Sequence, residues 1–287
     1  MRRCPRMSTH LPERLPKPAV LTERSARVAA AVKLHRHAGR RRAGLFLAEG
    51  ANLVIAAFER GLVREVFATA DAAHRHDAVL ADRRTPVHLV TERAAKALSD
   101  TVTPVGLVAV CEIPDVGLDE VLTGSPHLIA VAIGIGEPGN AGTLIRLADA
   151  MGASAVVLAG QSVDPYNGKC LRASTGSIFS VPVVIAPETQ ALLGQLRSAG
   201  LQVLATTVDG EMSLDDSDDV LAHPTAWLFG SESHGLPPEI AQQADRRITI
   251  PMAGGAESLN VAAASAICLY QSARALRRQP ATGTSAP

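Results

Sequence analysis

The chain has 287 residues, 47% of them hydrophobic and 20% charged, which suits one or two folded domains and excludes a disordered protein. The formal net charge is zero, but residues 1–42 hold twelve Lys and Arg against two acids, and the remainder holds sixteen against twenty-six. A basic arm on an acidic body indicates nucleic-acid binding more than membrane anchoring, because no apolar run accompanies the arginines. A solvated tail is the alternative.

The cysteines and the N-terminus bear on the compartment. Cys4, Cys111, Cys170 and Cys268 are far apart and form no C-x-x-C pair, so we expect neither a metal site nor disulfides. The basic N-terminus is followed by prolines instead of an apolar segment, and no stretch reaches the length of a membrane span. We therefore expect a cytoplasmic protein without a membrane segment.

The first half of the chain predicts a small α/β domain. Residues 1–24, rich in Pro and Arg, predict a flexible basic arm. Residues 25–112 alternate helix and strand patterns, with strands expected at 45–48, 63–68, 87–90 and 106–111 and helices from 25 and at 51–60, 71–81 and 92–98. The basic cluster Arg36, Arg40, Arg41 and Arg42 is the candidate RNA contact of this domain. A linker with one possible helical turn follows at 113–126.

The second half, 127–278, predicts an α/β domain with a parallel sheet. We expect strands at 128–133, 155–158, 178–185, 201–206, 225–229 and 246–251, and helices at 143–151, at 188–199 and from 258. The acidic run 215–219 is expected to be a solvated turn, and 279–287 a low-complexity tail.

Three loops of this domain follow strands and carry polar residues. The first, Gly134-x-Gly136-x-x-Gly139, fits the dinucleotide fingerprint formally, which makes a nicotinamide-dependent oxidoreductase an alternative. The match is weak, because Pro138 lacks an N–H and no acid directly ends the next strand. Asn140 and Arg146 could flank one pocket, or be a helix cap and a solvated arginine.

The other two loops contain glycines beside polar side chains. Glu232 is bracketed by glycines after a strand, which is where α/β proteins place ligands. In 250–261, Ser258 is expected as a helix N-cap and Asn260 in the first helical turn, where a polar ligand could bind. A capped core helix is the alternative. Lys169 and Arg172, in an expected polar loop at 164–176, could reach phosphates or lie in water.

These motifs together resemble, in order and spacing, those of the SpoU (TrmH-like) RNA ribose 2′-O-methyltransferases. The matching motifs are Glu137-Pro138-Gly139-Asn140 with Arg146, Phe229-Gly230-Ser231-Glu232 with Gly235-Leu236, and Ile250-Pro251 with Ser258-Leu259-Asn260-Val261. Residues 36–50 and 104–114 resemble the RNA-binding domain, similar to ribosomal protein L30e, that precedes many members. In size and layout the chain is similar to the 23S rRNA methyltransferases that give self-resistance to avilamycin or thiostrepton.

The resemblance implies a trefoil-knotted parallel sheet, S-adenosylmethionine as cofactor and a homodimer whose sites use both chains. It implies cofactor contacts at Thr206, Thr207, Gly230, Ile250, Met252 and Leu259, and an active site of Asn140, Arg146, Glu232, Ser258 and Asn260. Two residues depart from the family pattern, because Glu137 replaces the usual Asp and alanines follow Val261 where a serine is common.

The expected substrate is 23S rRNA, at a uridine. A tRNA methyltransferase and a non-catalytic RNA-binding protein are the alternatives. Arginine is a poor base because its pKa exceeds about 12, which favours Arg146 holding a phosphate or the developing alkoxide. The resemblance leaves Arg146 as a literal base open.

Overall fold

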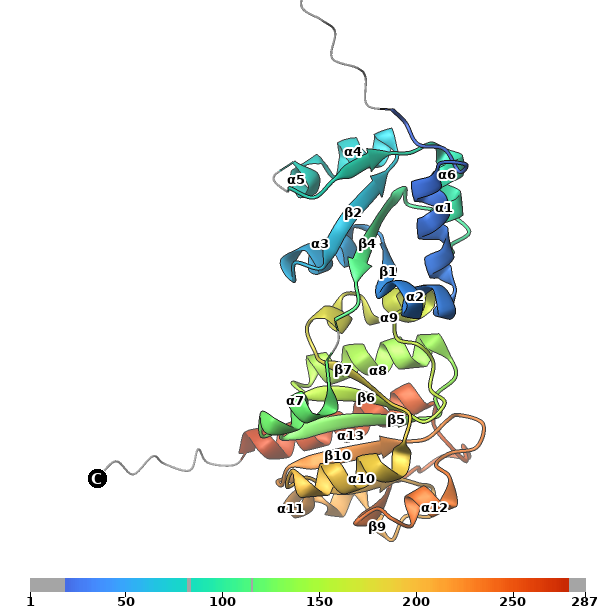
Figure 1. Cartoon of the computed structure of the whole chain (residues 1–287). Helices are drawn as coiled ribbons and strands as arrows, with labels where there is room; N and C mark the ends of the chain where they lie inside the picture. The colour runs from blue at the N-terminus through green and yellow to red at the C-terminus, as the bar shows by residue number, and fades with distance from the viewer. Residues whose placement is uncertain (1–18, 82–83, 115, 279–287) are drawn as a thin grey trace, which may run out of the picture.

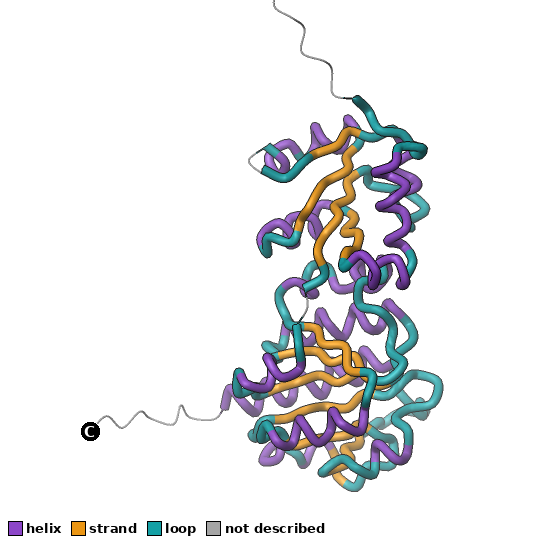
Figure 2. The backbone as a smooth tube through the Cα atoms, in the orientation of Figure 1, coloured by secondary structure: helices purple, strands orange, loops and turns teal. Residues whose placement is uncertain are grey.

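A computed structural model describes residues 19–81, 84–114 and 116–278. The chain forms two sheets with helices packed around each, and the two layered domains lie one above the other (Figure 1, Figure 2). The α/β class expected from the sequence is confirmed. Most of the expected basic arm and the whole of the expected tail lie outside the described residues.

The N-terminal domain has a four-stranded sheet in the order β1-β4-β2-β3. Strand β4 runs antiparallel to β1 and β2, and β3 runs parallel to β2. Successive strand residues face opposite sides, so Phe46 and Leu47 enter different cores. The elements are α1 Ala26–Val32, η1 Lys33–His35, α2 His37–Ala43, β1 Leu45–Glu49, α3 Ala51–Glu59, β2 Val63–Ala68, α4 Ala70–Arg75, α5 Asp77–Leu80, β3 Val87–Leu89, α6 Glu92–Leu98 and β4 Leu107–Glu112.

The C-terminal domain has a seven-stranded sheet in the order β7-β6-β5-β10-β8-β11-β9, and every adjacent pair is parallel. Its strands are β5 Leu128–Ile133, β6 Ala155–Ala159, β7 Val183–Ala186, β8 Gln202–Thr206, β9 Met212–Ser213, β10 Thr225–Phe229 and β11 Arg246–Thr249. Its helices are α7 Leu118–Thr123, α8 Pro138–Ala150, α9 Gly168–Ser174, η2 Ser177–Phe179, α10 Thr189–Ser198, η3 Leu214–Asp216, α11 Asp218–Leu221, α12 Pro238–Ala241 and α13 Val261–Arg278.

Helices cover both faces of the large sheet. Residues of α8, α11 and α13 share one core with alternate residues of β5, and residues of α7, α10 and α12 share the other. All six residues of β5 are buried, as expected for a central strand of a doubly covered parallel sheet. Because β5 has β6 on one side and β10 on the other, the strand order reverses there. The trefoil knot stays a prediction.

Two expected element boundaries in the C-terminal domain are wrong. Helix α8 begins at Pro138 and not at 143, because Glu137 caps it and proline suits the first helical position. The strand expected at 178–185 is confined to Val183–Ala186. The apolar residues Ile178 and Phe179 are buried in a 3-10 turn instead, and the expected loop before them contains helix α9.

Three other expectations need correction. The acidic run 215–219 is not a simple solvated turn, since Ser217 is buried and Asp218 forms ion pairs with Arg274 and Arg278 of α13. The last arm residues are held by the domain, because the backbone N–H of Leu21 donates to the Leu89 carbonyl at 2.8 Å. The helix expected at 71–81 is divided into α4 and α5.

No helix among the described residues is long and apolar enough to cross a membrane. Within the same ranges, no three His, Cys, Asp or Glu side chains are grouped so that they could hold a metal ion.

Helix α8 packs directly on α9, and a glycine makes this approach possible. A Cβ added to Gly142 would overlap the carbonyl oxygen of Cys170 and the Cβ of Ala173. Both partners lie on α9, so any side chain at 142 would push the helices apart. Gly142 therefore fixes the spacing between α8 and its neighbour.

We expect Gly142→Ala to lower the free energy of unfolding by roughly 1–3 kcal/mol, the usual cost of overpacking a core. For Gly194, in the middle of α10, no atom of the described residues lies within 4 Å of the same added atom. Gly194→Ala should therefore be neutral or stabilising by up to about 1 kcal/mol. Urea denaturation of both variants measures the difference, and equal stabilities would contradict a close helix contact at Gly142.

Candidate functional site

A cavity of about 470 Å³ lies beyond the carboxyl ends of β8, β10 and β11. This volume falls within the range of about 300–1,000 Å³ that small-molecule sites have. All six residues expected to contact the cofactor line it: Thr206, Thr207, Gly230, Ile250, Met252 and Leu259. Glu232 and Ser258, expected in the active site, line it as well.

The loop after β10 folds back tightly on itself. The backbone N–H of Gly235 donates to the Ser231 carbonyl at 2.8 Å, and Gly235 has a positive φ of 66°. A Cβ on Gly230 would overlap the backbone of Gly235 and Leu236. Only glycine at 230 allows this close approach, which leaves backbone groups and Glu232 facing the cavity.

The loop after β11 forms another wall. Residues 251–260 are all exposed, and the large apolar side chains of Met252 and Leu259 are 37% and 38% exposed. These side chains give the cavity an apolar surface that the rest of the domain leaves uncovered. Such surface suits the flat, apolar part of a ligand.

Helix α13 is capped by Asn260 and not by Ser258. The Oδ1 atom of Asn260 accepts from the backbone N–H of Ala262 at 2.9 Å and of Ala263 at 3.4 Å, and α13 begins at Val261. The expected helix start at Ser258 is therefore wrong by three residues. Ser258 stays in the exposed loop, where it lines the cavity.

The three motifs meet through their polar side chains. Asn140 of α8 donates its amide hydrogen bond to Glu232 Oε1. The amide of Asn260 donates in turn to Asn140 Oδ1 at 3.4 Å. These residues are 92 and 120 positions from Asn140 in sequence. Asn140, Glu232 and Asn260 thus form one continuous relay between the first turn of α8, the loop after β10 and the loop before α13, which we call the amide relay.

Arg146 lies apart from this relay. It is exposed on α8, and no described residue gives it an ion pair or a hydrogen bond. Six positions separate it from Asn140, which places the two side chains about 120° apart around the helix. Like Asn140 and Asn260, Arg146 does not line the cavity of the described chain, but unlike them it has no hydrogen bond to a residue that joins the cavity wall. The single chain therefore brings together four of the five expected active-site residues and leaves Arg146 outside.

The expected RNA-binding residues divide into exposed arginines at α2 and basic residues that form an ion pair with a carboxylate. Arg36, Arg41 and Arg42 are exposed on or beside α2. Arg40 is only 4% exposed and is bound to Asp164 of the other domain, so its assignment to RNA is wrong. Arg172 forms an ion pair with Asp100, and Lys169 forms one with Glu137. Neither basic residue of α9 is therefore without a partner.

Glu137 is held as a carboxylate by its neighbours. Lys169 Nζ lies 2.6 Å from Glu137 Oε1, and the backbone N–H of Gly139 donates to the same oxygen at 3.1 Å. The bond from Lys169, with a smaller contribution from Gly139, lowers the pKa of Glu137 below its ordinary value. The carboxylate caps the start of α8, beside the amide relay.

Sequence reasoning missed part of the cavity wall. Asp209, His234 and Arg247 line it, and Arg247 forms ion pairs with Asp209 and Glu211. Their positions just after β8, after β10 and within β11 are the signal that could have identified them. The hydroxyl oxygen of Thr207 is buried and has no hydrogen-bond partner among the described residues. A polar ligand atom would satisfy it.

Comparisons with known proteins match the same regions. A model described as the SpoU rRNA Methylase family matches residues 127–270, and one described as the MRM3-like substrate binding domain matches residues 25–109. The chain belongs to the SpoU rRNA methylase family. The family predicted from the three motifs is confirmed, and the N-terminal α/β unit is a substrate-binding domain of this family.

Two curated relatives of this SpoU methylase act on 23S rRNA. It is 32% identical, over 83% of its length and 92% of the relative, to the 23S rRNA (guanosine(2553)-2′-O)-methyltransferase of Bacillus subtilis. It is 36% identical, over 60% of its length and 61% of the relative, to the 23S rRNA (uridine(2479)-2′-O)-methyltransferase of Streptomyces viridochromogenes.

Among solved structures, the SpoU methyltransferase AviRb from Streptomyces viridochromogenes, in complex with AdoMet, superposes with a TM-score of 0.79. The two sequences are 32% identical, and the match covers 88% of this SpoU methylase and 98% of AviRb.

We expect the Lys169→Met variant to raise the pKa of Glu137 toward its ordinary value, because the main cause of the lowering is removed. Because the pKa of Glu137 is lower in the folded state than in the unfolded state, the pair stabilises the fold fully at a pH above the unfolded-state pKa. This stabilisation is lost as the pH falls through the folded-state pKa. NMR titration of the Glu137 carboxyl carbon measures the shift. Lys96→Met, at an exposed position of α6, is the control, and an unmoved midpoint in Lys169→Met would contradict the pair.

Proposed function

We propose that this chain transfers the methyl group of S-adenosylmethionine to a ribose 2′-hydroxyl of 23S rRNA. The observation that carries the proposal is the cavity beyond β8, β10 and β11, which all six expected cofactor residues line, with Glu232 of the amide relay in its wall. Membership in the SpoU family and the two relatives that methylate 23S rRNA support it. We place the activity in the cytoplasm, where ribosomes are.

The residues present fit S-adenosylmethionine. Met252 and Leu259 offer exposed apolar surface for the adenine, and the buried Thr207 hydroxyl lacks a partner among the described residues. Gly230 keeps backbone groups at the cavity wall. When bound, the cofactor supplies a methyl group on a sulfonium, which a nucleophile attacks in line. The protein must therefore orient the ribose hydroxyl and favour loss of its proton.

We expect Gly230→Ala to abolish cofactor binding, because its Cβ would overlap the backbone of Gly235 and displace the loop that forms the cavity wall. Gly254→Ala is the matched control, since an added Cβ there meets no atom within 4 Å in the part of the chain that the structure describes. Isothermal titration with S-adenosylmethionine measures both. Equal affinities for the two variants would exclude this wall as the cofactor site.

In the proposed mechanism Arg146 holds an RNA phosphate or the developing alkoxide. A guanidinium stays charged at neutral pH and donates several hydrogen bonds in a fixed plane, which suits this role better than proton removal. The absence of a described ion-pair partner leaves its charge available for RNA. Asn140 and Glu232 orient the substrate side of the cavity, and Asn260 fixes the loop after β11.

We expect Arg146→Ala to reduce kcat by at least about a hundredfold, as removal of a transition-state donor does, while leaving cofactor affinity unchanged. Arg146→Lys keeps the charge and loses the planar fork, so it should recover part of the activity if charge suffices and little if geometry matters. Arg246→Ala is the control, because Arg246 is an exposed arginine at the start of β11, at the end of the strand away from the cavity. Normal turnover in Arg146→Ala would remove Arg146 from the mechanism.

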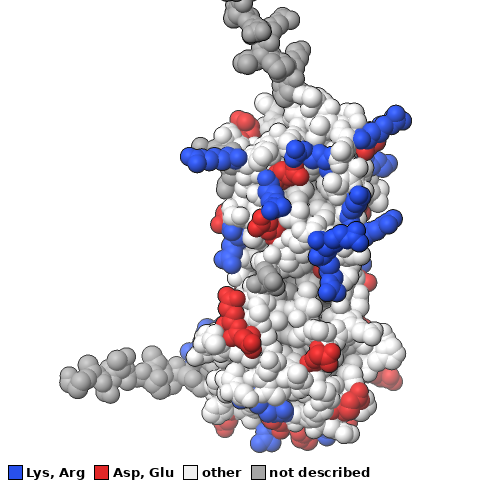
Figure 3. Space-filling model, in the orientation of Figure 1, with Lys and Arg blue, Asp and Glu red and all other residues white. Residues whose placement is uncertain are grey.

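The proposed RNA-binding surface is the exposed basic side of the N-terminal domain. Arg36, Arg41 and Arg42 project from α2 and its start. In the view of Figure 3, Lys and Arg side chains are more prominent over the N-terminal domain than over the C-terminal one, and Asp and Glu patches occur on both. This difference suits a domain that holds the RNA backbone beside a domain that performs the chemistry.

We propose a uridine of 23S rRNA as the target, on the likeness to the uridine-modifying relative and to AviRb. We also propose a role in resistance to a ribosome-targeting antibiotic, on the resemblance in size and layout to resistance methyltransferases that the sequence shows. Incubating the enzyme and cofactor with large-subunit rRNA, and mapping reverse-transcription stops at low nucleotide concentration, identifies the nucleotide. A stop at a guanosine would replace uridine with the specificity of the Bacillus subtilis relative, and methylation of tRNA alone would overturn the rRNA substrate.

We propose that the active enzyme is a homodimer, because Arg146 lies outside the cavity of its own chain and can complete a site only beside a second copy or on RNA. Helix α13, which packs on α8, also carries the half-exposed Tyr270. We expect sedimentation at micromolar concentration to give twice the chain mass. A fully active monomer would contradict the dimer.

A further inference from the structure

Arg40 is turned inward from a basic run and joins the two domains. Its side chain is 5% exposed. Its Nε and Nη2 atoms donate to Asp164 Oδ2 at 2.8 and 2.6 Å. Its Nη1 atom donates to the carbonyls of Leu34 and His35, each at 2.9 Å. The guanidinium of α2 therefore binds η1 of its own domain and a loop of the other domain at once.

Asp164 is equally fixed on the catalytic side. Its second carboxylate oxygen accepts from the backbone N–H of Tyr166 at 2.9 Å, and its side chain is 13% exposed. The Nε2 atom of the half-exposed His37 lies 3.9 Å from Asp164 Oδ2. Asp164 follows β6 and precedes α9, so the ion pair connects α2 to the segment that leads into α9.

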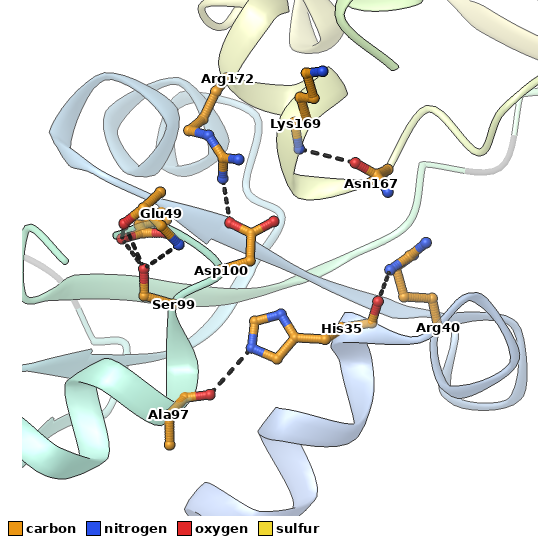
Figure 4. A network of polar contacts seen from close by, with 10 residues as sticks. His35, Arg40, Glu49, Ala97, Ser99, Asp100, Asn167, Lys169 and Arg172 are labelled. Carbon is orange, nitrogen blue, oxygen red and sulfur yellow. Dashed lines mark hydrogen bonds and ion pairs between the residues drawn. The ribbon is translucent and has the colours of Figure 1, made fainter. Parts of the chain in front are cut away.

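Other contacts between the two domains accompany this pair. The ring of Tyr166 lies against Phe46 of β1, with centroids 4.9 Å apart. Asp100 of the N-terminal domain binds Arg172 of α9 (Figure 4) and packs against Gly168, where a Cβ would overlap it. Figure 4 also shows Arg40 beside His35, whose ring contacts the carbonyl of Ala97.

The joint continues into the helix that carries the site. Helix α9 packs on α8 through the glycine contact at 142, and Lys169 of α9 binds Glu137 at the start of α8. Asn140 follows in the first turn of α8, and Arg146 lies farther along it. A displacement of the N-terminal domain would therefore either move α9, and with it α8, or increase the distance between α2 and α8.

We propose that Arg40 is a positioning residue, which with Asp164 holds the RNA-binding surface of α2 at a fixed place relative to α8. Domains joined by a short linker move relative to one another by default unless their interface prevents it. A buried ion pair adds little net stability, but separating its two partners leaves an uncompensated buried charge, which costs free energy. Such a pair therefore favours the one geometry in which both charges are paired. The kinetic part of this inference rests on the proposed function.

The geometric part is measured without any activity. Spin labels at Lys96→Cys on α6 and Gln195→Cys on α10, in the full chain carrying Cys4→Ser, report the distance between domains, since both positions are exposed. We expect one narrow distance distribution in the parent protein and a broader one in Arg40→Met. Asp164→Asn keeps the side-chain volume and the oxygen that accepts from the Tyr166 N–H, but removes the negative charge. It should also broaden the distance distribution, and it serves as the second variant if Arg40→Met does not fold.

The kinetic part separates positioning from folding. We expect Arg40→Met to lower kcat on rRNA by about 10–100-fold, because small misplacements of bound groups cost this much, with an unchanged Kd for S-adenosylmethionine. Arg40→Lys should recover part of the loss. Arg41→Met removes the same charge from the same helix, and should weaken RNA binding and its salt dependence while leaving the distance distribution narrow.

An unchanged narrow distribution in both Arg40→Met and Asp164→Asn would overturn the proposal, as would a kcat that falls only with the folded fraction. If the parent protein transfers no methyl group to rRNA, the proposed function fails, and the distance measurement still decides the role of Arg40.

Discussion

Helices cover both faces of the seven-stranded sheet, so a ligand can approach its strands only at their ends. Every adjacent pair is parallel, which places all carboxyl ends at one edge. Loops that leave this edge must carry whatever chemistry the domain performs. The loops after β8, β10 and β11 meet there around one cavity, and α8 brings Asn140 to the same place. The position of the site is thus a consequence of how the sheet is buried.

Sequence reasoning predicted that the residues at this edge of the sheet lie close together because they belong to ordered motifs at the ends of strands. Glu232 and Asn260 were expected together with Asn140, and hydrogen bonds join them. The same reasoning failed where local pattern and tertiary packing disagree. The apolar residues at 178–179 resembled a strand, yet they are buried in a turn beneath the N-terminal domain, where Phe179 stacks near Phe46.

Arg40 shows why a cluster of like charges is ambiguous in sequence. Four arginines at 36, 40, 41 and 42 predict one basic surface, but a helix turns about 100° per residue and points neighbours in different directions. The partner that draws Arg40 inward, Asp164, lies 124 positions away. Only the folded chain reveals that pair. The residues expected to contact the cofactor escaped this ambiguity, because the short loops that follow parallel strands all lie at one edge of the sheet.

The cap on α13 gives the amide relay a direction. Asn260 uses its oxygen to accept from Ala262, so only its nitrogen can face Asn140. Asn140 must then present its oxygen to Asn260 and its nitrogen to the carboxylate of Glu232. Hydrogen atoms thus point along the relay from helix α13 to the anion, and neither amide can rotate by half a turn without opposing like partial charges. A carboxylate in place of Asn260 would reverse that polarity, so the beginning of one helix dictates how a side chain on another is oriented.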